Sequence, residues 1–454
     1  MEKSLSTKIG EGLFFFISNA LLLKAIGLIS IFLILRQLTV YEYGVSELVF
    51  SVVALMNLFL LPGIGDLLLA EIGIEKGEGN LSRIKKLFSD YAKLSISLGI
   101  IFWLLLFFGA SIIGDFYGKN IANLFRIASF LFIFSGFRTL MTLLFNIYLK
   151  FFNFSLISFL DELGKLCFLA LFFFYFHLRI EGIFLAHVFS QLITFFVLVP
   201  SSLKIYRTFA SVSASRDISL KQIFLKHGKW GVFISYLKTL SDNIRLWLIK
   251  FFLGTEAVGL FAVAYGLFGH TSALFPLSSV VRPVIPQYVH LKEKFYHLLE
   301  KSMKYQLLGY LFIGIIAFFL FPPIIIRLFP NYASSIFLFK GMLFALIPIS
   351  FAAIFTQTFY AIRAQKSFFL ALFVPFASIA VFLPAFTYFF GTAGIIYEFV
   401  LTSALFTLER YRVLRKLLPD FHPSLKDFFS LDDMDRYFIK EIKKFILLKA
   451  KIKY

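Results

Sequence analysis

The chain has 454 residues, of which 59% are hydrophobic and only 16% are charged, and its mean hydropathy is +0.85. This composition excludes a soluble enzyme of this size and indicates an integral membrane protein. The formal net charge of +19 would suggest a nucleic-acid partner for a soluble protein, so the placement of the charge along the chain has to decide.

Twelve apolar stretches are long enough to cross a bilayer, which takes about 20 residues. In chain order they cover 13–35, 45–71, 94–114, 124–148, 154–177, 182–203, 230–252, 257–281, 305–326, 334–360, 368–389 and 392–409. The first is too long for a cleavable signal and lacks a small-residue cleavage site. The pattern predicts an all-α, polytopic membrane protein with about 12 transmembrane helices.

Lysine and arginine gather on alternate loops. With the N-terminus in the cytoplasm, 33 of the 45 Lys and Arg residues lie on the inner segments. The positive-inside rule therefore predicts a multi-pass protein of the cytoplasmic (inner) membrane with both termini in the cytoplasm. Topology and attraction to anionic membrane lipid, about 1 kcal/mol per basic residue, account for the charge, so no nucleic-acid partner is expected.

Two halves of the chain show weak internal similarity. RQLTVYEYGVSELVF matches FFLGTEAVGLFAVAY with Gly44 and Gly259 215 residues apart, and Gly182 matches Gly394 at 212 residues. Both repeats run in the same direction through the membrane, which predicts two six-helix lobes related by an axis along the membrane normal. The predicted divisions are lobes over 1–204 and 230–417, a cytoplasmic linker over 205–229 and a basic tail over 418–454.

Prolines and the C-terminal tail add local predictions. Pro62 with Gly63, and Pro276 at the matching place in the second lobe, are expected to kink or break their helices. The tail ends in RYFIKEIKKFILLKAKIKY, which predicts an amphipathic helix lying on the inner leaflet. The alternative is a disordered basic tail.

The stretch 230–252 carries a charged face. Ser235, Lys238, Ser241, Asp242 and Arg245 fall on one helical stripe, opposite an apolar face. A charge at the bilayer centre costs about 3 kcal/mol even on insertion scales. A helix that keeps three of them is predicted to line a path for a polar solute.

Basic residues within the predicted spans form the candidate cationic cavity for an anion such as a phosphate or pyrophosphate: Lys24, Arg138, Lys165, Lys238, Arg245 and Lys340. Candidate polar or ion-coupling groups are Asp161, Glu162, Asp242, Asp66 and Glu398. Asp161 is expected to neutralise Lys165, and Asp242 to neutralise Lys238 and Arg245. Lys24 and Arg138 have no such partner on their own helices and rank first, whereas Lys340 has snorkelling as an equal alternative. The whole set could instead only staple helices together.

Several chemistries lack a signal in the sequence. There is no G-x-x-x-x-G-K-[ST] motif, no HExxH and, with Cys167 alone, no disulfide or cysteine metal site within the chain. The outer loops are short for a membrane glycosyltransferase or polymerase. A non-enzymatic transporter without metal or cofactor is predicted, and coupling to a proton or sodium gradient is left open.

The segment LILRQLTVYEYGVSELVFSVVALMNLFLLPGIGDLLLAE resembles the first two helices of bacterial oligosaccharide-lipid flippases, the polysaccharide-export proteins of the multidrug/oligosaccharidyl-lipid/polysaccharide superfamily. SDNIRLWLIKFFLGTEAVGLFAVAYGL is similar to the start of their second lobe. FPNYASSIFLFKGM, RAQKS and GTAGIIYEFV follow in the family's order. The resemblance covers nearly the whole chain.

The resemblance implies a V-shaped bundle around a central cationic cavity that opens alternately to each side. Its substrate would be a polyprenyl-pyrophosphate-linked oligosaccharide for O-antigen, capsule or exopolysaccharide assembly, with polysaccharide polymerases as further partners. Lys24, Lys238, Asp242 and Arg245 match the family's cavity segments. Replacing Lys24 or Arg245 by Ala is predicted to abolish export while the protein still inserts.

Four other functions are weighed against this one. The closest is an ion-coupled multidrug exporter of the same superfamily, which would need deep carboxylates to dominate. A membrane glycosyltransferase or polymerase and a generic lipid scramblase rank below it. A peptidoglycan-precursor role also ranks lower, because related lipid II flippases have two extra spans.

Overall fold

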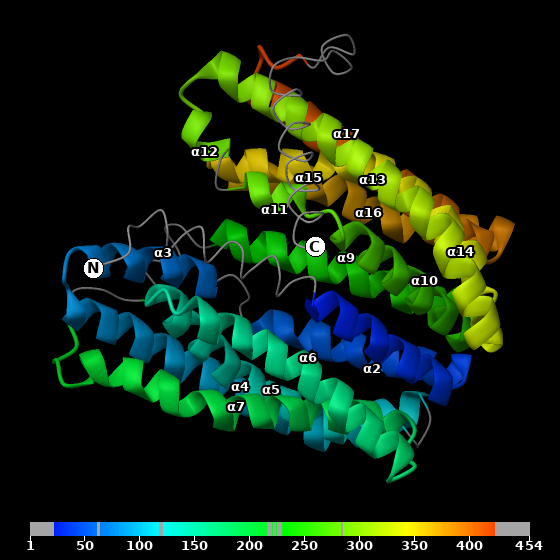
Figure 1. Ribbon diagram of the computed structural model, residues 1–454, viewed down its shortest axis with the longest axis horizontal. Helices are drawn as coiled ribbons and strands as arrows, with labels where there is room; N and C mark the ends of the chain where they lie inside the picture. Colours follow the sequence, from blue (N-terminus) through cyan, green and yellow to red (C-terminus); the bar gives the residue numbers. More distant parts are fainter. Residues whose placement is uncertain are drawn as a thin grey trace, which may run out of the picture.

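The computed structural model describes residues 22–60, 64–117, 121–215, 220, 224, 229–282 and 285–422. Within these ranges the chain is helical and forms no β-strand. Lipid offers no hydrogen-bond partner to backbone amides, so an apolar chain in a bilayer satisfies them within helices. The helices form two groups that splay apart from a common seam (Figure 1), which confirms the predicted all-α, V-shaped bundle of two lobes.

The first lobe contains one helix for each predicted span and one additional helix. Its elements are a helix over 22–37, α2 (Val40–Asn57) continued by the 3₁₀ turn η1 (Leu58–Leu60), α3 (Ile64–Gly77), α4 (Leu81–Tyr117), α5 (Ile121–Ile147), α6 (Phe151–Phe174) and α7 (Ile180–Ala210). The predicted span 45–71 falls on two described helical segments, since η1 ends at Leu60 and α3 begins at Ile64. Pro62 and Gly63 themselves lie outside the described residues.

The second lobe repeats this plan. It contains α9 (Lys229–Leu253), α10 (Thr255–Ala273), α11 (Leu277–Val281), α12 (Ile285–Tyr288), α13 (Lys292–Leu328), η3 (Pro330–Tyr332), α14 (Ser335–Met342), η4 (Leu343–Ala345), α15 (Leu346–Ala361), α16 (Gln365–Phe390) and α17 (Ala393–Leu417). η4 joins α14 to α15, so the three form one spanning unit over Ser335–Ala361.

The predicted helix break at Pro276 is confirmed, because α10 ends at Ala273 and Pro276 directly precedes α11. A break inside a membrane protein leaves backbone groups that need other partners. Gln306 of α13 supplies them: its amide oxygen accepts from the backbone N–H of Ser278 at 3.1 Å, and its amide nitrogen donates to the carbonyl of Phe275 at 3.2 Å.

Seven of the described helical segments are long and apolar enough to cross a membrane: Val40–Leu60, Leu81–Asp115, Ile121–Ile147, Ile180–Ala210, Lys292–Leu328, Ser335–Ala361 and Gln365–Phe390. α6, α9 and α17 match predicted spans, but each of these helices carries three or more charged residues. Large apolar side chains on the outside of the bundle, such as Phe108 and Phe251, are exposed as lipid contact requires.

Two predicted segments are described only in part or not at all. α7 continues to Ala210, past the predicted end of the first lobe at residue 204, and of the predicted linker over 205–229 the structure describes 205–215, 220, 224 and 229. The predicted amphipathic helix of the tail also lies outside the described part, which ends at residue 422.

The lobes meet mainly where α2 of the first packs against α9 and α10 of the second. Gly44 and Gly259, the two positions matched in the repeat, face each other's helices at this glycine seam. A Cβ added to Gly44 would collide with the carbonyl oxygen of Thr255, and one added to Gly259 with that of Val40. The repeat therefore places two glycines where the helix backbones are in direct contact.

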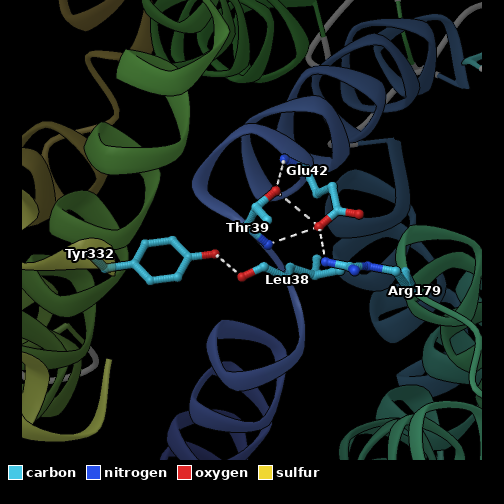
Figure 2. Close-up of polar contacts among 5 residues, drawn as sticks. All are labelled: Leu38, Thr39, Glu42, Arg179 and Tyr332. Carbon is cyan, nitrogen blue, oxygen red and sulfur yellow. Dashed lines mark hydrogen bonds and ion pairs between the residues drawn. The ribbon is translucent and has the colours of Figure 1, made fainter. Parts of the chain in front are cut away.

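Polar contacts reinforce the same end of the bundle, called the closed end below. The hydroxyl of Tyr332, in the second lobe, donates to the carbonyl of Leu38 in the first at 3.0 Å (Figure 2). Thr39 and Glu42 form a capping box at the start of α2, and Arg179 pairs with the same carboxylate. Tyr332 is fully buried, so its hydrogen bond joins the lobes away from water.

Replacing Tyr332 by Phe is expected to weaken closure. A lost hydrogen bond of this kind costs about 1 kcal/mol, or roughly a fivefold change in the ratio of closed to open molecules. Spin labels at the exposed Tyr175 and Tyr388, one on each lobe, with Cys167 replaced by Ser, would report that ratio as a distance distribution. Tyr41→Phe, at an exposed side chain, is the control; equal distributions for both variants would contradict the assignment.

Candidate functional site

The predicted charged stripe of α9 faces a cavity in the second lobe. Lys238, Asp242 and Arg245 recur about once per turn, which places them on one side of the helix. That side lines a cavity of about 410 Å³ that α10, α15, α16 and α17 complete. The stripe therefore borders an interior space rather than lipid.

Arg245 is held by a partner that the sequence did not predict. Its Nε and one terminal nitrogen each donate to a carboxylate oxygen of Glu398 on α17 at 2.9 Å. The Arg245 side chain is 6% exposed and that of Glu398 is 0% exposed. Arg245 therefore forms its ion pair with Glu398 rather than with Asp242, because the two-pronged bond satisfies the guanidinium better than a neighbour on its own helix can. Asp242 still attracts Arg245 electrostatically.

Asp242 lies on the cavity wall with a different contact. The hydroxyl of Tyr265 on α10 donates to one of its carboxylate oxygens at 3.2 Å. Asp242 is therefore a cavity-lining carboxylate, whereas Glu398, also a candidate for ion coupling, is sequestered by Arg245.

Two cations share one aromatic ring in this cavity. The Lys238 ammonium lies 5.5 Å from the centre of the Phe368 ring, and the Arg410 guanidinium lies 5.3 Å from the same centre. Both residues line the cavity. With Arg245 they make three cations against the two carboxylates of Asp242 and Glu398, so the site carries one net positive charge.

In the first lobe the structure pairs the predicted charges differently from the expectation. Arg138 of α5 pairs with Asp161 of α6 at 3.0 Å, and Lys165 pairs with Glu162 one turn back on α6. The ion pair of Asp161 is therefore with Arg138, which α5 brings from a neighbouring helix, while Lys165 contributes a weaker electrostatic attraction.

Lys24 lies where the lobes approach each other. It is exposed and has no ion pair or hydrogen bond within the described part of the chain. A Cβ on nearby Gly27 would approach His270 of α10 at 3.4 Å and Glu162 at 3.9 Å. The charges of Lys24, Glu162 and Lys165 in the first lobe therefore act on the imidazole of His270 in the second lobe.

The remaining candidates lie away from both groups. Lys340, in the last turn of α14, lies 4.5 Å from the centre of the Phe318 ring and does not line the cavity. Asp66 falls in α3, and its side chain is outside the described part.

Sequence reasoning missed three residues of the site. Arg410 lies one residue beyond the predicted end of the last span, so it was not among the basic residues predicted within spans, but α17 continues to Leu417 and carries it into the cavity. His270 and Tyr265 are single polar residues in an apolar helix, and only the packing of α10 shows that they face charged groups. A helix drawn past residue 409 would have found Arg410.

Two helical lobes that carry charged interior groups and are joined at one end form a multi-pass membrane fold. It is similar to the lipid II flippase MurJ in an inward closed conformation, with a TM-score of 0.68 at 14% identity over 97% of this chain and 99% of that one. It is also similar to an inward-facing multidrug resistance MATE transporter of the MOP superfamily, with a TM-score of 0.65 at 15% identity over 87% and 96%. A MATE transporter from Vibrio cholerae gives 0.60 at 13% identity over 91% and 100%.

Residues 33–330 match the family of polysaccharide biosynthesis proteins, and the chain belongs to that family. No curated protein matches the sequence. The predicted resemblance to the polysaccharide branch of this superfamily is confirmed. The similarity spans 97% of this chain and 99% of the lipid II flippase. Coverage therefore does not distinguish this protein from that flippase by the number of spans, which was the argument against a peptidoglycan-precursor role.

Proposed function

We propose that this protein is a flippase that moves a polyprenyl-pyrophosphate-linked oligosaccharide across the cytoplasmic membrane for the assembly of a surface polysaccharide. The observation that carries the proposal is the net positive cavity of a bundle that belongs to a polysaccharide biosynthesis family. A pyrophosphate linker is an anion, and fixed cations in a low-dielectric cavity attract it strongly. No covalent bond of the substrate need change.

Movement of the two lobes about the glycine seam would supply alternating access. The closed end carries Leu38, Arg179 and Tyr332, whereas 33 of the 45 Lys and Arg residues fall on segments predicted for the opposite side of the membrane. With the positive end in the cytoplasm, the structure corresponds to an inward-facing state in which the substrate headgroup enters from inside. Both termini are then cytoplasmic, and polysaccharide polymerases are the expected downstream partners.

An ion-coupled multidrug exporter is the second candidate, because Asp242 is a carboxylate on the cavity wall. Such a site would attract cationic drugs. The described cavity residues sum to a positive charge instead, since Glu398 is occupied by Arg245 and Arg410 adds a further cation. A net positive cavity favours the anionic substrate.

Lys24→Ala is expected to lower the transport rate of a fluorescent polyprenyl-pyrophosphate oligosaccharide in proteoliposomes by more than about tenfold, the worth of one charge-assisted contact. Its melting temperature should not change, because Lys24 is exposed and has no described partner. Lys292→Ala, which removes an exposed lysine paired only with exposed Asp420, is the matched control.

Wild-type rates in Lys24→Ala would remove this lysine from the transport path. Failure of the wild-type protein to move the lipid, together with efflux of a cationic dye under a proton or sodium gradient, would favour the exporter over the flippase.

A further inference from the structure

Arg410 is a cation without a carboxylate among the described residues. One terminal nitrogen donates to the carbonyl of Ala352 at 3.0 Å, and the guanidinium lies 5.3 Å from the centre of the Phe368 ring and 5.5 Å from that of Phe406. Its Nε is buried and has no hydrogen-bond partner in the described structure. A guanidinium has five N–H donors, so most of its capacity remains for a ligand.

The ammonium group of Lys238 lies 5.5 Å from the centre of the same Phe368 ring. It makes no ion pair with any described residue, and the nearest carboxylate, that of Asp242, already accepts from Tyr265. Lys238 and Arg410 therefore repel each other within the cavity. Two like charges in a low-dielectric space are unfavourable unless an anion lies between them.

Arg245 differs from these two cations. Its Nε and one terminal nitrogen both donate to Glu398, and both side chains of this pair are buried. Its charge is therefore compensated inside the protein, and releasing it for a ligand would leave a buried carboxylate unpaired. The free cationic capacity of the cavity is concentrated on Lys238 and Arg410.

We propose that Lys238 and Arg410 form the subsite for the phosphate-bearing group of the lipid-linked substrate, an inference that rests on the proposed function. The cavity of about 410 Å³ falls within the range of about 300–1,000 Å³ that holds a small-molecule ligand. Its remaining wall includes Leu237, Phe268, Ile349 and Leu372, which lower the local dielectric and strengthen the attraction to an anion. Phe368 is buried beneath both cations and holds them at the cavity surface.

Binding of short isoprenoid phosphates tests the subsite apart from transport. The full-length protein in phosphatidylcholine nanodiscs is titrated with farnesyl pyrophosphate, farnesyl monophosphate and farnesol, and binding is measured by native mass spectrometry. The variants are Arg410→Gln, Lys238→Gln and the charge-conserving Arg410→Lys. Arg412→Gln, an exposed arginine on the same helix, and Lys366→Gln, a lysine 5.9 Å from the Trp230 ring outside the cavity, are matched controls.

The affinity of wild type should fall in the order pyrophosphate, monophosphate and alcohol. Arg410→Gln and Lys238→Gln should each lose tenfold or more for farnesyl pyrophosphate and less than twofold for farnesol, while Arg410→Lys should lose only two- to tenfold for farnesyl pyrophosphate. A second series in nanodiscs containing phosphatidylglycerol separates the source of the phosphate. Little competition is expected from that lipid, and full displacement of the probe would identify a phospholipid headgroup site and overturn the assignment to substrate.

Wild-type affinity in both glutamine variants, or equal losses for the pyrophosphate and the alcohol, would also overturn the subsite. If the glutamine variants do not fold, Arg410→Lys decides the question. Its ratio of farnesyl pyrophosphate affinity to farnesol affinity should be two- to tenfold lower than that of wild type, and an unchanged ratio would overturn the subsite. Binding as expected without flipping in proteoliposomes would instead overturn the proposed function and leave the subsite standing.

Discussion

Gly44→Ala is expected to open the closed end. The new methyl group would collide with the carbonyl oxygen of Thr255, and Gly259→Ala would collide with that of Val40. The atoms that each new methyl group meets belong to a helix backbone, which cannot move aside as a flexible side chain could. Overpacking of this kind costs about 1–3 kcal/mol, which changes the ratio of closed to open molecules by about 5- to 150-fold.

Spin labels at Tyr175 and Tyr388 would show this change as a move of the distance distribution to longer values, accompanied by a lower transport rate. Gly109→Ala is the matched control, because a Cβ there meets no atom within 4 Å. Size-exclusion chromatography would show that each variant is folded. A wild-type distance distribution in both seam variants would mean that the lobes do not close through these glycines.

Arg245→Ala is expected to destabilise the protein as well as to impair transport. Removing one partner leaves Glu398 buried and unpaired at 0% exposure, and such a loss costs about 3–5 kcal/mol. Loss of export with insertion into the membrane is still expected, and the destabilisation is added to it. Glu398→Ala should show a similar cost.

Reversible unfolding in mixed micelles would measure the free energy of each variant. The double variant Arg245→Met with Glu398→Leu should recover to within about 1 kcal/mol of wild type, since apolar replacements of a buried ion pair are often neutral. Arg412→Ala, which breaks an exposed pair with Glu409 on the same helix, should cost less than about 1 kcal/mol. A small effect of Arg245→Ala would show that water reaches the Arg245–Glu398 pair.

Features set by local composition were predictable. Hydrophobic runs of spanning length predict the helices, because each satisfies its own backbone within lipid. Pro276 predicts a break because it lacks an amide N–H, and α10 ends just before it. The end of α17 was missed because charged residues near Arg410 look like a loop in sequence, although the helix continues to Leu417.

By itself, therefore, the sequence determined the class of protein, the approximate spans, the repeat that matches Gly44 with Gly259, and the charged stripe of α9. Tertiary structure alone decided which charges are paired. Arg245 meets Glu398 across 153 residues, and Arg138 meets Asp161 from the neighbouring helix. An ion pair depends on distance in space, and helical periodicity specifies only neighbours about one turn away, so Lys238 and Arg410 could be recognised as uncompensated only after α9, α16 and α17 had been placed together.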